Sequence, residues 1–152
     1  MAPATATRPV PRRWLADLLP DTLSAATVRE PTPDLVDRVR QGLPTAIIDR
    51  LVASEVLFTA EIDRLILPRR TLADRKEARQ PLTAAESDRL ARLLRVLLWA
   101  EDTFQNPDKA HQWLRRPNRA LGDRVPLELL DTDAGAEAVT AVLTRIDSGV
   151  YT

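Results

Sequence analysis

The chain has 152 residues, of which 44% are apolar and only 4% aromatic, which is enough for one sizeable core or two small helical units. Alanine, leucine and arginine dominate, while residues that favour strands are sparse and never alternate for long, so we expect an all-α fold. Acidic and basic residues number 22 each, so the overall charge gives no reason for tight non-specific binding to nucleic acid or to an anionic membrane.

The lack of cysteine excludes disulfides, thiolate metal sites and cysteine nucleophiles, and it fits a cytoplasmic protein. No apolar run approaches the roughly 20 residues that span a bilayer, so we expect no membrane segment. Residues 1–20 are rich in proline and are predicted to form an extended arm, with one short helix as an option inside "RRWLADLL". The arm lacks the apolar stretch of a secretory signal, and a transit peptide is a weaker alternative.

Residues 21–80 are predicted to form a domain of short helices that contains a helix-turn-helix. Thr32 and Gly42 delimit a helix over 33–41, and a second helix is expected over 45–54. Thr59 is expected to cap "AEIDRLI", and another short helix follows the turn at Pro68. Two short helices joined by a turn of three or four residues are typical of a helix-turn-helix unit.

Residues 81–152 are predicted to form a second helical domain, which begins near Gln80 and Pro81. Thr83 and Glu86 form a capping box before leucines at helical spacing, which predicts a helix of about twenty residues ending near Phe104. A short helix is expected from Pro107, a single helical turn from Pro126, and a last helix that is capped by Thr132 or Asp133 and stopped by Gly149.

The sequence shows no convincing catalytic, metal or cofactor site. His111 has no H-x-x-x-H or H-x-x-E partner and is interpreted as a surface or helix-packing residue. The four glycines cannot form a dinucleotide or phosphate loop, and the acidic "LLDTDAG" is more simply a helix N-terminus than a metal loop. We therefore expect no catalytic residue, no metal and no cofactor.

A cluster of basic residues follows Pro68 in "RRTLADRKEAR". Two interpretations are about equally supported, a solvated helix face with internal ion pairs and the second helix of a helix-turn-helix that contacts DNA. The second interpretation assigns DNA contacts to Arg69, Arg70, Thr71, Arg75, Lys76 and Arg79.

The stretch "KAHQWLRRPNRALGDRVPLELLDTDAGAEAVTAVLTRIDSGVY" resembles the toxin-binding domain of the Xre/MbcA/ParS antitoxins. The resemblance is carried by an alanine helix ending in Trp-Leu, a Pro-Asn, a Leu-Gly turn, a Pro-Leu-x-Leu-Leu, a Thr and Gly before the last helix, and a terminal Gly-Val-Tyr. The residues are Ala110, Trp113, Leu114, Pro117, Asn118, Leu121, Gly122, Pro126, Leu127, Leu129, Leu130, Thr132, Gly135, Gly149, Val150 and Tyr151. Upstream residues resemble the junction with the family's Xre-like helix-turn-helix, and Asp123 stands where the family often has a second glycine.

The resemblance implies an antitoxin that covers the NAD pocket of a RES-domain toxin, in a hetero-oligomer with two or more copies of each chain. It also implies an antitoxin homodimer, operator DNA as a further partner, and no enzymatic activity. Toxin contacts are expected at Trp113, Asn118, Arg145, Gly149, Val150, Tyr151 and Thr152. A ring beyond the glycine stop has no core to enter by its own helix, so Tyr151 is the strongest candidate. Two alternatives remain, a stand-alone helix-turn-helix transcription regulator and a small helical enzyme.

Overall fold

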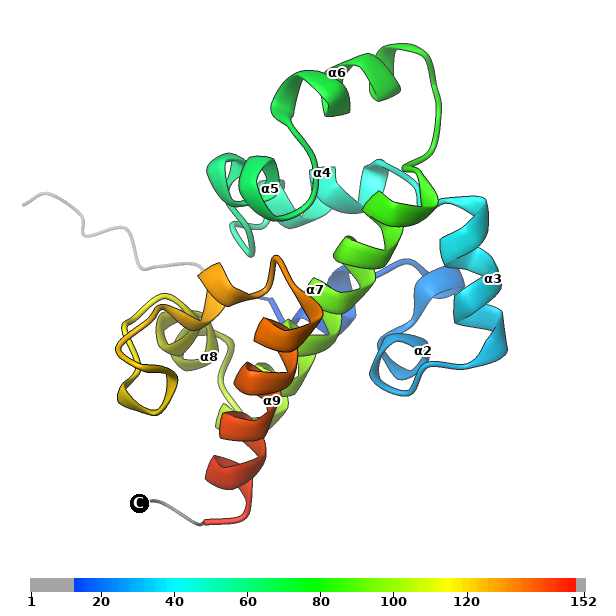
Figure 1. Cartoon of the computed structure of the whole chain (residues 1–152). Helices are drawn as coiled ribbons and strands as arrows, with labels where there is room; N and C mark the ends of the chain where they lie inside the picture. Colours follow the sequence, from blue (N-terminus) through cyan, green and yellow to red (C-terminus); the bar gives the residue numbers. More distant parts are fainter. Residues whose placement is uncertain (1–12, 150–152) are drawn as a thin grey trace, which may run out of the picture.

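The computed structural model describes residues 13–149, and this part of the chain is helical throughout (Figure 1). It contains no β-strand, only an isolated antiparallel bridge between Asn118 and Arg124. The all-α prediction is confirmed. The elements are α1 (Leu15–Leu18), η1 (Asp21–Leu23), α2 (Ala25–Arg29), α3 (Pro33–Gln41), α4 (Ala46–Ala53), α5 (Thr59–Leu65), α6 (Arg69–Glu77), α7 (Ala84–Phe104), α8 (Pro107–Leu114), η2 (Arg119–Leu121), η3 (Pro126–Leu129) and α9 (Asp133–Asp147), where η marks a 3₁₀ turn.

Helix α7 runs through the middle of the molecule and packs against elements from both ends of the chain (Figure 1). Helices α8 and α9 lie against one side, α2 and α3 lie against the other, and α1 also packs against α7. The predicted capping box forms, since Glu86 N–H donates to Thr83 Oγ1 and Thr83 N–H donates to Glu86 Oε1. The helix expected to support the C-terminal domain therefore supports the N-terminal elements as well.

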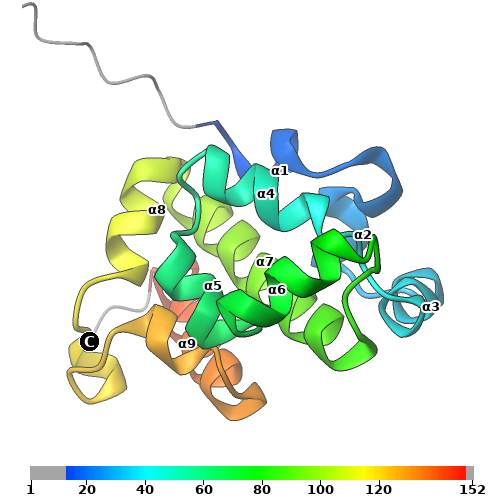
Figure 2. The ribbon, with the colours of Figure 1, turned by 90° about the horizontal axis from the view of Figure 1, so that it is seen from above.

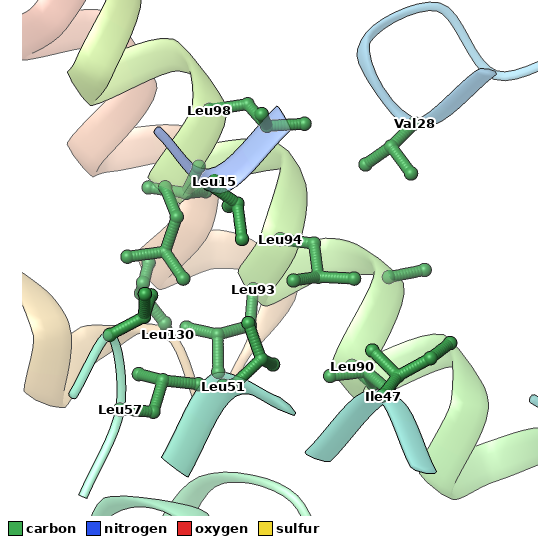
Figure 3. Close-up of a cluster of buried hydrophobic side chains, with 14 of the residues drawn as sticks. Leu15, Val28, Ile47, Leu51, Leu57, Leu90, Leu93, Leu94, Leu98 and Leu130 are labelled. Atoms are coloured by element: carbon green, nitrogen blue, oxygen red, sulfur yellow. The ribbon is translucent and has the colours of Figure 1, made fainter. Parts of the chain in front are cut away.

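The core is built mainly from leucines that converge on α7 (Figure 3). Leu90 and Leu94 are fully buried, and Leu51 and Leu57 approach them from the α4 region. Leu130 reaches the same cluster from the turn before α9. Because one continuous cluster joins elements from Leu15 to Leu143, the described residues share a single core.

Helices α4, α5 and α6 lie together over the start of α7 (Figure 2). The turn of residues 66–68 joins α5 to α6, as expected for a helix-turn-helix. The start of α5 differs by one residue from the prediction, because Phe58 takes the cap position and its N–H donates to Glu61 Oε1 at 2.9 Å. Helix α6 has no fully buried residue, and half-buried Leu72 is its one apolar side chain packed against the core.

The short helix considered within the N-terminal arm forms as α1 and is part of the core. Leu15 is fully buried, Leu18 and Leu19 are nearly so, and Leu15 N–H donates to Glu101 Oε2 at 2.9 Å. Residues 1–12 lie outside the described part of the chain.

The tight turns between α8 and α9 account for several residues of the family pattern. Asn118 Oδ1 accepts from Ala120 N–H at 2.9 Å, and Gly122 has a left-handed backbone with φ of 65°. Asp123 is also left-handed, with φ of 60°, a conformation that favours glycine. A Cβ on Gly135 would lie 1.7 Å from Leu129 O, so only glycine allows α9 to start this close to η3.

Candidate interaction surfaces

Three of the predicted DNA contacts are unpaired cations, two of them on α6 and the third two residues after its end. Arg69, Arg70 and Arg79 are exposed, and within the described residues their side chains make no ion pair. Arg69 begins the helix, and its N–H donates to Asp63 Oδ1 at 2.6 Å. Thr71 is half-buried. These three arginines are therefore available to phosphates.

The other two cations of the cluster are held by carboxylates of the same chain. Arg75 Nε lies 2.7 Å from Glu86 Oε1, and Arg75 Nη2 donates to Glu86 Oε2 at 3.2 Å. Lys76 pairs with Asp49 on α4. Arg75 and Lys76 thus form ion pairs with other helices, and not within the face of α6 as the alternative interpretation expected. Arg75 joins α6 to α7, so it has a structural task independent of DNA.

Glu86 remains ionised despite its burial. Burial by itself would raise the pKa of the carboxyl group. The hydrogen bonds from Thr83 and the charge and hydrogen bond of Arg75 outweigh this effect, and the pKa of Glu86 lies below its ordinary value. The start of α7 is therefore stabilised by a charged carboxylate.

The predicted toxin contacts separate into packed residues and exposed ones. Trp113 is half-buried, and the centroid of its ring lies 5.7 Å from that of Phe104. The side chain of Asn118 accepts a hydrogen bond within the turn that follows. Arg145 is exposed near the end of α9, and Gly149, with φ of 69°, follows the helix. The remaining predicted contacts, Val150, Tyr151 and Thr152, lie outside the described residues.

A groove beside α8 combines the Phe104–Trp113 pair with basic side chains. It has a volume of about 580 Å³. Its lining includes Lys109, Arg116 and Arg119 and contains no acidic residue. The sequence-based prediction included Trp113 and Asn118 from this groove but not its cations.

Two polar contacts at or directly after α8, one buried and one partly buried, were not foreseen from the sequence. His111 Nε2 lies 3.0 Å from Glu101 Oε1, and both side chains are almost completely buried, so the expected packing histidine is part of a polar pair. Arg115 donates to Glu61 and to Val56 O, and its guanidinium lies 5.0 Å from the centre of the Phe58 ring. Glu101 lies ten positions from His111 on the preceding helix, and the partners of Arg115 lie more than 50 positions away, so no helical spacing could have identified them.

The described residues contain no group of three or more His, Cys, Asp or Glu side chains that could hold a metal ion. None of their helices combines the length and apolar character needed to cross a membrane.

The chain matches two family models. The antitoxin Xre-like helix-turn-helix domain matches residues 34–95, which include α4, α5 and α6. The antitoxin Xre/MbcA/ParS C-terminal toxin-binding domain matches residues 100–149, which include α8, α9 and the basic groove.

Full-length relatives agree with these matches. The chain is 36% identical over 120 residues to Antitoxin Xre of Photorhabdus laumondii, covering 78% of this chain and 81% of the relative. It is 36% identical over 112 residues to Antitoxin Xre of Pseudomonas putida, covering 74% and 70%. It is also 29% identical over 140 residues to the Prs ADP-ribosylating antitoxin of a Sphingobium species, covering 83% and 86%.

Proposed function

The chain belongs to the Xre/MbcA/ParS family of antitoxins, whose members bind a toxin and are not enzymes, and we propose that its partner is a RES-domain toxin that consumes or transfers NAD. The observation that carries this proposal is the toxin-binding domain at residues 100–149, in which α9 buries one face and leaves the other free. The proposed complex is cytoplasmic and contains two or more copies of each chain.

The proposed inhibitory element is the end of α9 with the residues that follow it. Ala136, Val139, Val142 and Leu143 fix α9 on the core, whereas Arg145 and Gly149 are exposed. A rigid helix is a better support for an inhibitory segment than a loop, because less conformational entropy is lost on binding. Tyr151 is proposed to cover the NAD pocket of the toxin, with its ring supplying apolar area and its hydroxyl a polar contact.

Truncation after Ser148 tests this element. The shortened chain is expected to keep its helical content but to lose about thirtyfold in affinity for the toxin, which corresponds to a hot spot of roughly 2 kcal/mol. The measurement is the NAD that remains beside active toxin at limiting antitoxin concentration. Full protection by the truncated chain would remove Tyr151 from the mechanism.

A second proposed function is binding to the chain's own promoter as an autorepressor. Its support is the α5–α6 pair with Arg69 and Arg70 on α6 and Arg79 just after it, three cations that make no ion pair within residues 13–149. A homodimer or a larger complex with toxin places two such helices on two half-sites, which strengthens binding.

The promoter test replaces Arg69, Arg70 and Arg79 with alanine. We expect weaker binding of the toxin–antitoxin complex to the DNA upstream of its coding region, and a flatter dependence on salt because fewer counterions are released. Asp74→Ala on the same helix is the control. If promoter binding survives the loss of all three arginines, α6 does not contact the DNA. Tight DNA binding by the free chain without any toxin partner would favour the stand-alone regulator.

A further inference from the structure

The groove beside α8 is a basic hollow with an aromatic floor. Its charged rim is formed by Lys109 on α8 and by Arg116 and Arg119 in the following turn. Its floor includes Phe104 from the last turn of α7 and Trp113 from α8, both half-buried. The floor is rigid, because the two rings pack against each other and against the core.

The charge of the groove is not compensated by the rest of the described chain. The side chains of Lys109, Arg116 and Arg119 make no ion pair with any residue between 13 and 149. This contrasts with Arg115 next to them, which is held by Glu61 at 2.8 Å. Three like charges around one hollow repel each other, and an anionic partner would relieve this repulsion.

We propose that this groove receives an acidic segment of the toxin that carries an apolar or aromatic anchor residue. The carboxylates would pair with the rim cations, and the anchor would pack on the Phe104–Trp113 floor. Aromatic and arginine side chains at the centre of a contact are the residue types that contribute most to protein–protein binding. This proposal rests on the proposed function, because it takes the toxin as the partner.

The position of the groove favours a protein partner over nucleic acid. The groove lies within residues 100–149, the part of the chain that matches the toxin-binding domain. Helix α6 lies at the other end of the molecule (Figure 1). No residue of α9 lines the groove, so it forms a contact separate from the end of that helix. The toxin would thus be bound at two places, which increases the overall affinity.

The test reverses two charges of the groove with Arg116→Glu and Arg119→Glu in the full-length chain. Its binding partner is the purified toxin encoded by the neighbouring open reading frame. The matched control, Arg13→Glu with Arg40→Glu, makes the same charge change at two exposed sites, one before α1 and one on α3. Rates and affinities are measured by surface plasmon resonance at low and high salt, and thermal unfolding checks that each variant is folded.

We expect the groove variant to bind the toxin about tenfold more weakly, mainly through slower association, with a reduced dependence on salt. The control should retain the wild-type rates, and Arg116→Lys with Arg119→Lys should retain most of the affinity because the charge is kept. Unchanged toxin binding by the folded groove variant, or an equal loss in the control, would overturn the proposal.

Two further outcomes would also overturn it, by assigning the groove to another partner. One is unchanged toxin binding together with loss of binding to a short single-stranded oligonucleotide. The other is a change only in the oligomeric state of the free chain, measured by analytical ultracentrifugation. If the wild-type chain itself does not bind the toxin, the proposed function fails, and with it the partner assigned to the groove.

Discussion

Arg115, directly after α8, holds Glu61 in the first turn of α5 by two hydrogen bonds, 2.8 Å from Nη2 to Oε1 and 3.1 Å from Nε to Oε2. The same guanidinium donates to Val56 O at 2.9 Å and stacks on Phe58. Glu61 belongs to the part that matches the helix-turn-helix model, and Arg115 belongs to the part that matches the toxin-binding model. This pair therefore joins the part of the chain that matches the helix-turn-helix model to the part that matches the toxin-binding model.

Replacing Arg115 with lysine should loosen this junction. Lysine keeps the charge but cannot donate to two carboxylate oxygens and a carbonyl in one plane. We expect Arg115→Lys to lower the free energy of unfolding by about 1–3 kcal/mol, measured by urea denaturation. Arg38→Lys, which changes an exposed pair with Asp34 on α3, should cost less than about 0.5 kcal/mol. An equal loss of stability at the two sites would show that the hydrogen bonds of Arg115 contribute no more than an exposed ion pair.

Leu94 lies fully buried in the centre of α7 (Figure 3). Because its removal leaves a cavity in the shared core, Leu94→Ala should destabilise the whole protein by roughly 2–5 kcal/mol. The measurement is thermal or urea unfolding, and Val36→Ala, at a side chain that is 42% exposed, is the control. A Leu94→Ala protein with an unchanged unfolding midpoint would contradict the burial of this face.

Gly135 is required by the approach of α9 to η3. An added Cβ would meet Leu129 O, a backbone atom that cannot rotate away, so the two elements would have to separate. We expect Gly135→Ala to reduce the free energy of unfolding by roughly 1–3 kcal/mol. Ala138→Ser, at an exposed position of the same helix, should change it by less than about 0.5 kcal/mol. A Gly135→Ala protein with the unfolding free energy of the wild type would mean that η3 and α9 are not packed this closely.

The lowered pKa of Glu86 links stability to pH. The pKa of the Glu86 carboxyl group is lower in the folded than in the unfolded protein. Such a group contributes its full stabilisation of the fold at any pH above the pKa of the unfolded chain, which is about 4.3 for glutamate. This stabilisation is lost as the pH falls through the lower pKa of the folded protein. We expect Glu86→Gln to lower the free energy of unfolding by roughly 1–2 kcal/mol at pH 7.

The difference between wild type and Glu86→Gln should shrink as the pH is lowered from about 5 to about 3, because the wild-type carboxyl group then becomes protonated. Denaturant titrations at several pH values measure this difference in the free energy of unfolding, and Glu77→Gln at an exposed position is the control. A difference that stays constant over this range would show that the Arg75–Glu86 pair does not stabilise the fold.

Local signals in the sequence predicted most of the elements correctly. Thr32 and Gly42 delimit α3, and the Thr83–Glu86 capping box starts α7, because these residues act through neighbours within four positions. The family was also recognised from short motifs in residues 110–151, and the comparisons confirm it.

Long-range contacts could not be predicted in the same way. The sequence predicted an extended N-terminal arm with one short helix as an option, but it gave no sign that Leu15 of this helix is buried and that its N–H donates to Glu101, 86 positions away. The arginines of α6 looked equivalent, but the fold pairs Arg75 with Glu86 and gives Arg70 no ion pair with any residue between 13 and 149. The basic groove arises only when the end of α7 meets α8. Each of these features depends on tertiary packing, which no local spacing reveals.

The central claim, that this chain neutralises a RES-domain toxin, is tested most directly with the purified toxin from the neighbouring open reading frame, NAD and increasing amounts of the full-length chain. NAD is measured over time, with Leu94→Ala, in which a core side chain is removed, as a comparison. We predict that NAD consumption stops once the antitoxin equals the toxin in concentration, and that the destabilised variant protects less at temperatures where it unfolds. Undiminished NAD consumption in the presence of an excess of folded wild-type chain would contradict the account.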